Sequence, residues 1–236
     1  MLKDLPCLNI LGEDYIIGVK MDDLKWIGHA SFLLQINGVN VYIDPFDLRM
    51  GKEHADVILV THPHYDHFSP NDIRKVADNS TQIFVPKELE PKVDVGMVTG
   101  VVPDRKYSAR GIEFETVPAY NTVESKLQYH PKANGWVGYI VNANGRRIYH
   151  PGDTDFIEEM KGLKLDLALV PIGGTYVMDV HEAVEAANSM EANQVSPMHY
   201  KMLLGREGSA KAEGFFKMKA KNAKILKEIQ EPKYSF

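Results

Sequence analysis

Three histidines and an aspartate lie within six residues in the stretch His62-Pro63-His64-Tyr65-Asp66-His67, and this stretch constrains the fold most. The residues before it, 56–60, form a short apolar run rich in branched side chains, which is typical of a strand buried on both faces. After it, Ser69 and Pro70 supply a helix cap and a suitable first helical residue. The stretch is therefore predicted on a strand-to-helix loop at the carboxyl end of a strand, where open α/β sheets bind ligands.

The spacing of these side chains favours two metal ions over one. His62 and His64 alternate across one residue and can face one ion, while Asp66 and His67 lie further round the loop and can face another. Neutral imidazoles and carboxylates suit zinc, manganese or iron(II), and the lack of nearby cysteine argues against a cysteine-rich structural zinc site. A solvated polar loop is the alternative, and it would explain a lone histidine better than this repeated pattern.

This stretch and several other motifs resemble the metallo-β-lactamase superfamily. The others are Gly152-Asp153-Thr154 and Pro197-Met198-His199-Tyr200. Trp26 to Ser31 and Ile43-Asp44-Pro45 are similar to the branch that holds the ascorbate-lactonate lactonases and the N-acyl-phosphatidylethanolamine phospholipases D. The resemblance begins near residue 24 and implies an α/β (α+β) fold, a four-layer αββα sandwich with a metal centre at one edge. It implies hydrolase chemistry and leaves the substrate open.

The resemblance also implies a set of metal ligands. His62 and His64 would bind the first ion, Asp66, His67 and His199 the second, and Asp153 both. A carboxylate can span two cations about 3.5 to 4 Å apart, and the pair lowers the pKa of a shared water. A turn-capping aspartate and a packed core histidine are the alternatives for Asp153 and His199.

The third ligand of the first ion departs from the pattern of the family. In the phospholipase-like relatives a histidine follows the Pro-Ala pair, whereas Pro118-Ala119-Tyr120-Asn121 presents Asn121 here. We predict that His130, from the long irregular segment 122–135, takes this place, because asparagine is a poor ligand for a borderline ion. If neither residue binds, the first site is weak and the centre holds one ion.

Further residues are predicted to support the ligands or to line a pocket beside them. His29 would orient Asp66 or Asp153 by a hydrogen bond, and His150 would support the ligands or pack on their strand. The remaining candidates are Tyr65, Tyr120, Asn121, Tyr176, Asp179 and Tyr200. The tyrosines can equally complete a core, and Asp179 can cap a helix with Glu182 three residues later. His54 and His181 are predicted on the surface.

Local signals predict several elements outside the cluster. Asn37-Gly38 and Asn144-Gly145 each indicate a β-hairpin. Residues 72–77 are predicted helical, a C-terminal helix is predicted to begin at a cap, Ser209, and residues 225–229 are predicted to form a strand. The loop 46–53, with Arg49 and Lys52, would overhang the metal site or remain a solvated surface loop.

Composition indicates a soluble protein of one domain, residues 1–236, with residues 1–23 as a surface extension. The net charge of −5 gives no attraction to nucleic acid or to an anionic membrane. Cys7 is the only cysteine, so no intramolecular disulfide is possible and a reducing compartment fits. The first ten residues include charges and a proline and precede no long apolar stretch, so we expect no signal peptide, no stable membrane association and a cytoplasmic location.

Together these features predict a metal-dependent hydrolase with two zinc ions, or manganese or iron(II) in their place. Hydroxide generated at the metals would attack a small, soluble, anionic ester, lactone or phosphodiester. Asp66 and Asp153 would be the catalytic carboxylates, with Asp66 passing a proton to the leaving group. The alternative is a non-catalytic metal-binding or regulatory module on the same fold. The metal-type residues that are retained together argue against this module, while the missing third histidine of the first site leaves it open. The sequence leaves the substrate and the oligomeric state open.

Overall fold

The structure is a computed structural model that describes residues 15–16, 19–20, 23–49 and 53–230. The predicted N-terminal extension lies largely outside these residues, as does Lys52. Within the extension, strands β1 (Tyr15–Ile16) and β2 (Val19–Lys20) pair in antiparallel fashion.

The first half of the chain forms a six-stranded sheet with the order β3-β4-β5-β6-β7-β8. The first three strands are antiparallel neighbours, and β5 to β8 run parallel to one another. The strands are β3 (Leu24–Gly28), β4 (Ser31–Ile36), β5 (Val39–Ile43), β6 (Val57–Leu59), β7 (Gln82–Pro86) and β8 (Met97–Val101).

The second half forms another six-stranded sheet, with the order β14-β13-β12-β11-β10-β9. Its strands β9 to β12 are antiparallel, and β12, β13 and β14 are parallel. The strands are β9 (Lys106–Ala109), β10 (Ile112–Pro118), β11 (Val137–Ala143), β12 (Arg146–His150), β13 (Lys164–Pro171) and β14 (Glu191–Met198).

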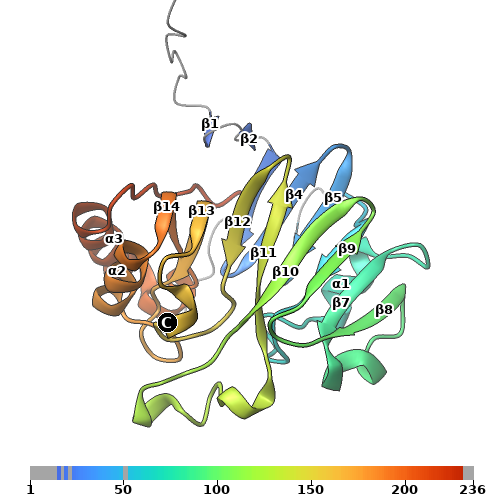
Figure 1. Ribbon diagram of the computed structural model, residues 1–236, viewed down its shortest axis with the longest axis horizontal. Coiled ribbons are helices and arrows are strands. Elements are labelled where there is room, and N and C mark those ends of the chain that lie inside the picture. The colour runs from blue at the N-terminus through green and yellow to red at the C-terminus, as the bar shows by residue number, and fades with distance from the viewer. Residues whose placement is uncertain (1–14, 17–18, 21–22, 50–52, 231–236) are drawn as a thin grey trace, which may run out of the picture.

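The two sheets pack face to face, with helices on their outer sides (Figure 1). Phe84 from the first sheet meets Phe114 from the second edge to face, with ring centroids 4.9 Å apart. Each such buried side chain contributes roughly 1.5–3 kcal/mol relative to exposure. Helix α1 (Pro70–Val76) packs on the outer side of the first sheet through Ile73 and Val76, and α2 (Val180–Ser189) packs beside β13 and β14. The predicted four-layer αββα sandwich is confirmed.

Short 3₁₀ helices fill several of the connections. They are η2 (Lys87–Lys92), η3 (Glu124–Lys126), η4 (Lys132–Asn134) and η5 (Glu158–Met160). Two of them, η3 and η4, lie in the long segment 122–135, which is otherwise irregular as predicted. None of the described helices is long and apolar enough to cross a membrane.

The two predicted hairpin turns and the predicted helix caps at Ser69 and Asp179 are confirmed. β4 and β5 meet at Asn37-Gly38, and β11 and β12 meet at Asn144-Gly145. The hydroxyl of Ser69 accepts from the backbone N–H of Asp72 at the start of α1. Asp179 caps α2 by accepting from the N–H groups of the second and third helical residues. Glu182, which was predicted to complete this cap, does not do so, because its carboxylate accepts from the N–H of Phe156 instead.

Helix α3 (Lys201–Lys219) does not begin at Ser209, as predicted, but directly after Tyr200. Gly205 interrupts it with a non-helical backbone (φ 64°, ψ −176°) that glycine tolerates readily. Ser209 lies four residues after this break and is buried inside the helix rather than at its start. The prediction mistook an interior serine for a cap.

The predicted strand at 225–229 is also wrong, because this segment makes only an isolated bridge to β3. Its polar groups bind the end of β3 instead: Ile229 donates from its N–H to the Trp26 carbonyl at 2.9 Å, and Glu228 Oε1 accepts from the N–H of His29 at 3.3 Å. Gln230 continues the contact and accepts from the N–H of Arg49 at 2.8 Å. We call residues 228–230 the C-terminal clasp.

Candidate metal centre

The metal-type residues come together where several strands reach their carboxyl ends. β6 leads into the loop 61–69, β12 into Asp153 and β14 into His199. The hydroxyl of Tyr139, on β11, crosses between the sheets and donates to the carbonyl of Val60 at 2.8 Å. This bond fixes the backbone directly before the loop, so the loop starts from a rigid strand end.

The first group of side chains consists of His62, His64 and His130. His64 Nδ1 lies 3.1 Å from His62 Nε2 and 3.2 Å from His130 Nε2. Burial lowers the pKa of His130 to about 4 and that of His62 well below its ordinary value, and burial also lowers the pKa of His64. Three neutral imidazoles therefore direct nitrogen atoms at one point, as the ligands of a borderline cation do. We call them the three-histidine group.

Asn121, the rival for the third position, stands behind His130. Its Oδ1 accepts from His130 Nδ1 at 2.9 Å, and its Nδ2 donates to the carbonyl of Tyr176 at 3.0 Å. Because Nδ1 of His130 is the donor in this bond, the lone pair of its Nε2 faces the other two histidines. The structure thus places His130 in the group and gives Asn121 the role of orienting it.

The second group consists of Asp66, His67 and His199, and we call it the aspartate group. His199 Nε2 lies 3.7 Å from Asp66 Oδ2. His29 Nε2 binds the same oxygen at 2.9 Å, so the structure places His29 against Asp66, one of the two partners predicted for it. Burial alone would raise the pKa of Asp66, but the imidazoles of His199 and His29 lower it, and the carboxylate is charged at neutral pH.

Asp153 lies between the two groups and turns one oxygen to each. Its Oδ1 is 3.2 Å from His67 Nε2 and 3.2 Å from His199 Nε2. Its Oδ2 is 3.5 Å from His130 Nε2 and 4.0 Å from His62 Nε2. Although burial would raise the pKa of Asp153, His199 and His67 hold it well below its usual range. A charged carboxylate that faces two ligand groups is what a bridging position requires.

Several of these atoms fit a cation and lack any other partner. Nε2 of His67, Nε2 of His199 and Oδ1 of Asp153 are buried, and each lies outside hydrogen-bonding geometry with every other described atom. An orphaned buried polar atom costs about 1–3 kcal/mol, and three at one point would be a heavy penalty without a ligand. Nitrogen and carboxylate donors of this kind fit zinc, manganese or iron(II).

Asp44 and Thr61 hold the aspartate group from behind, and the sequence analysis assigned neither of them a role. Asp44 is fully buried and accepts from the N–H of Thr61 at 2.8 Å, from its hydroxyl at 2.6 Å and from His67 Nδ1 at 2.7 Å. Burial would lower the pKa of His67, but the carboxylates of Asp153 and Asp44 raise it well above its ordinary value. Since Nδ1 donates to Asp44, a cation at Nε2 would replace the second proton.

Gly152 lets the loop that carries Asp153 pass close to the loop that carries the histidines. Its backbone has φ +68°, and a Cβ atom there would stand 2.9 Å from the Cβ of Thr61. A side chain at this position would push the two loops apart. The glycine before Asp153 is therefore required by close approach as well as by backbone conformation.

Two aromatic side chains that the sequence analysis missed border the centre. The buried ring of Trp136 packs against all three members of the three-histidine group, with centroids 5.2–5.6 Å apart. The ring of Phe46 lies 6.2 Å from that of His29. Phe46, the first residue of the loop 46–53, thus lies beside the centre, and the overhang of the rest of this loop stays a prediction. Arg49 pairs with Asp47 at 3.0 Å, and Lys52 lies outside the described residues.

Other predicted residues lie away from the ligands. His150 is buried and binds the carbonyl of Ala30 through Nε2 at 2.8 Å, which is the packed role. Tyr200 is fully buried, stacks near Trp26 and hydrogen-bonds Glu213, so it completes the core and lines no exposed surface. Its place directly after His199 suggested a pocket position, but the chain turns there into α3.

The remaining candidates are closer to the solvent. Tyr65 and Tyr176 are exposed beside the centre, and Tyr120 binds Glu159 through its hydroxyl at 3.0 Å. Asp179 is exposed and serves as a helix cap. His54 and His181 lie on the surface, as predicted. His54 pairs with Asp78, and His181 packs on Phe215.

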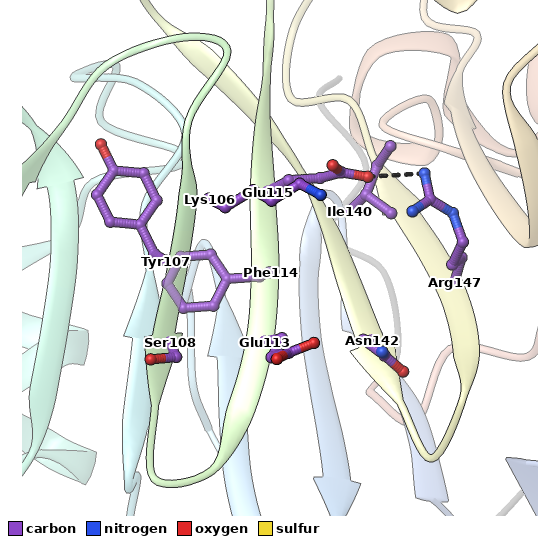
Figure 2. A pocket seen from close by; sticks show the side chains of 9 residues that line it. All are labelled: Lys106, Tyr107, Ser108, Glu113, Phe114, Glu115, Ile140, Asn142 and Arg147. Atoms are coloured by element: carbon purple, nitrogen blue, oxygen red, sulfur yellow. Dashed lines mark ion pairs between the residues drawn. The ribbon is translucent and has the colours of Figure 1, made fainter.

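A hollow of about 420 Å³ lies elsewhere, on the second sheet (Figure 2). Strands β9 to β12 line it with polar and charged side chains, and Arg147 pairs with Glu115 across it at 2.7 Å. None of the residues of the two ligand groups takes part. It lies apart from both ligand groups, so concavity alone does not make it a candidate active site.

Comparison with known proteins agrees with this geometry. The sequence profile described as "Beta-lactamase superfamily domain" matches residues 23–199. A UPF0173 protein of Pyrococcus abyssi is 33% identical over 199 residues, covering 81% of this chain and 88% of the relative. A UPF0173 metal-dependent hydrolase of Lawsonia intracellularis is 31% identical over 200 residues, covering 74% and 81%. A crystal structure from Parabacteroides distasonis, of a protein named as a metal-dependent hydrolase, has TM-score 0.76 and 29% identity and covers 87% of this chain and 92% of that one.

Proposed function

Since this chain belongs to the family of the beta-lactamase superfamily domain, we propose that its two ligand groups bind two cations and hydrolyse a small, soluble ester, lactone or phosphodiester. The relatives are named metal-dependent hydrolases, and the chain is an enzyme of this general class. The observation that carries the finer proposal is Asp153, whose two oxygens face the two groups.

In this proposal each group holds one cation, and the preferred ion is zinc, with manganese or iron(II) as alternatives. The three-histidine group offers three imidazole nitrogens, and the aspartate group offers two imidazoles and a carboxylate. Asp153 adds one oxygen to each set. When bound, such cations lower the pKa of water enough to supply hydroxide near neutral pH and polarise the bond under attack.

The side chains supply orientation and proton transfer. Asp153 is 4% exposed and is enclosed by imidazoles, whereas the side chain of Asp66 is 18% exposed and can meet a substrate. His29 fixes the Asp66 carboxylate through Oδ2. We assign to Asp66 the transfer of a proton: its carboxylate would first accept the proton released by the attacking water and then pass it to the leaving group, because it is the carboxylate of the centre that reaches the solvent.

The substrate is proposed to be small and soluble because the net charge of −5 gives the chain no general attraction to a polyanion such as nucleic acid or to an anionic membrane. Arg49, considered above as an extra contact for an anion, already pairs with Asp47. The negative charge that develops during attack on a carbonyl or phosphoryl group would be stabilised at the metal centre.

The test is metal reconstitution followed by a screen of esters, lactones and phosphodiesters. We expect roughly two equivalents of metal by elemental analysis and an activity that chelation removes. Asp66→Asn and His199→Ala should abolish activity while circular dichroism shows a retained fold. The matched control is His54→Ala, which removes an exposed histidine outside the centre. Full activity in the chelated protein would refute the proposal, and metal binding without any hydrolysis would favour the binding module.

A further inference from the structure

More than half of the large hydrophobic side chains exposed in the described part of the chain lie on segments that carry or adjoin the candidate ligands. Of the seven large hydrophobic residues exposed in the described part of the chain, four lie on segments that carry or adjoin the ligands. These four are Tyr65, Val123, Leu127 and Tyr176. Water-exposed apolar groups that gather at one place mark a binding surface more often than scattered ones do.

One aromatic pair stands on the side of the aspartate group. Tyr65 lies between His64 and Asp66 in the chain and is 74% exposed. Its ring packs edge to face against Phe46, with centroids 6.0 Å apart, and Phe46 in turn contacts His29. Tyr65 is thus supported at one edge and offers its remaining surface to the solvent beside the ligands.

A second pair stands on the side of the three-histidine group. Tyr129 precedes His130, and its ring meets that of Tyr176 edge to face at 4.9 Å. The carbonyl of Tyr176 accepts from Asn121, so this pair is tied to the support of His130. Asn121 in turn binds His130, whose Nε2 lies 3.2 Å from His64 Nδ1, and Tyr65 follows His64 directly in the chain, so the two pairs flank the same ligands. We call Phe46, Tyr65, Tyr129 and Tyr176 the aromatic rim.

The lysine side chains on the segment 122–135, which borders the centre, already bind other groups of the protein. Lys126 binds Asp155 at 2.9 Å and the carbonyl of Val177 at 2.8 Å. Lys132 binds Glu159 at 3.1 Å and lies over the ring of Tyr120. The surroundings of the centre therefore favour flat apolar groups over a second anionic group.

Building on the proposed function, we propose that the aromatic rim binds an aryl group of the substrate, and that the substrate is an aryl-bearing ester or lactone. The ring of the substrate would contact Tyr65 and Tyr176 in stacked or edge-to-face geometry, while its ester or lactone carbonyl lies at the metal centre. The rim would thus set substrate specificity, and the ligand groups would perform the hydrolysis.

The kinetic test uses three methyl esters with the same leaving group and the same carbonyl surroundings. These are methyl 3-phenylpropanoate, methyl 3-cyclohexylpropanoate and methyl butanoate, each assayed with the zinc-loaded enzyme. We expect kcat/KM for the phenyl ester to be about tenfold or more above the value for the butanoate ester. We expect it to be about two- to tenfold above the value for the cyclohexyl ester. Equal rates for the phenyl and cyclohexyl esters would overturn the aryl proposal.

Variants locate the preference in the rim. Tyr65→Ala and Tyr176→Ala should reduce the phenyl-to-cyclohexyl ratio toward one, and Tyr65→Phe should preserve it because the ring remains. Met218→Ala, which removes an exposed apolar side chain on α3, should keep the wild-type ratio. A ratio unchanged in both tyrosine-to-alanine variants would refute the assignment to the rim.

A binding experiment separates this proposal from the proposed function. Calorimetry with the zinc-loaded protein should show 3-phenylpropanoate binding about tenfold more tightly than butanoate, and Tyr65→Ala should remove the difference. If this preference holds but none of the esters is hydrolysed, the hydrolase proposal fails and the aryl site stands. If the esters are hydrolysed but no aryl preference appears in rate or binding, the aryl site is refuted and the hydrolase proposal stands.

Discussion

The two ligand groups of the centre have similar atoms at the front but different partners behind them. In the aspartate group, His67 donates to the buried carboxylate of Asp44 and Asp66 is bound by His29. In the three-histidine group, the partner of His130 is the neutral amide of Asn121. A carboxylate partner makes an imidazole a stronger base and a stronger metal ligand than an amide does. The aspartate group should therefore hold its cation more tightly.

The two groups also differ in the backbone that carries them. His199 follows directly from β14 and His67 lies on the short loop between β6 and α1, whereas His130 comes from the irregular segment 122–135. This segment is anchored by Asp155, which is fully buried and accepts from the N–H groups of Thr122 and Val123 at 2.8 and 3.0 Å. Strand ends are fixed by the sheet, while a loop ligand depends on a few such anchors.

The largest effect is expected where the two groups share a residue. Asp153→Ala should reduce metal content from about two equivalents toward zero, because each group loses an oxygen and the groups lose the charge that balances two cations. Elemental analysis after dialysis measures the loss, and circular dichroism reports the fold. If Asp153→Ala retained one tightly bound equivalent, the residue would belong to one group and not to both.

Stepwise removal of metal should reveal the difference between the groups. We expect a chelator titration to release one equivalent at roughly tenfold lower chelator concentration than the other. His130→Ala should abolish this first phase and leave the second, while His199→Ala should affect the second. Release of both equivalents in a single phase from the wild-type protein would remove the basis of the comparison.

The supporting residues should have smaller, graded effects. Asp44→Ala should lower metal affinity at the aspartate group about 10- to 100-fold, and should cost about 3 kcal/mol of stability because it leaves three buried donors unpaired. Asn121→Ala should act only on the three-histidine group, at the low end of that range, with a weaker effect than His130→Ala. Isothermal titration with zinc and urea unfolding measure the two quantities. A stronger effect from Asn121→Ala than from His130→Ala would make Asn121 the ligand.

The smallest effect is expected at the hollow of Figure 2, which offers a control for the whole centre. The ion pair between Arg147 and Glu115 is partly exposed, so Arg147→Ala should cost at most about 1 kcal/mol. Metal content and activity should not change, because the residues of the hollow lie outside the ligand groups. A loss of activity in this variant would assign the hollow a function.

Much of the fold could be predicted from local signals in the sequence. The turns at Asn37-Gly38 and Asn144-Gly145 and the cap at Ser69 depend on a few neighbouring residues, and the structure has them where they were predicted. The prediction at Ser209 failed because a serine inside a helix and a serine at its start look alike without knowledge of packing. The segment 225–229 failed since its apolar and polar residues bind the end of β3 rather than a strand along their length.

The ligand types of the site were visible in the sequence, but their partners were not. The histidine-rich loop is a local pattern, whereas Asp44 reaches His67 from 23 positions away and only after two strands have paired. Trp136 and Phe46 have no motif that distinguishes them from core aromatics. His130 was favoured over Asn121 on ligand chemistry alone, and the hydrogen bond that joins these two residues could be seen only in three dimensions.

The C-terminal clasp also has a consequence for how the protein is made. Glu228 accepts from the backbone of His29, and Gln230 binds the loop that begins with Asp44. A ribosome therefore releases both loops long before it has synthesised the residues that hold them in place. The backbone beside the candidate ligands thus gains its last contacts only when residue 230 has emerged, after every candidate ligand has been synthesised.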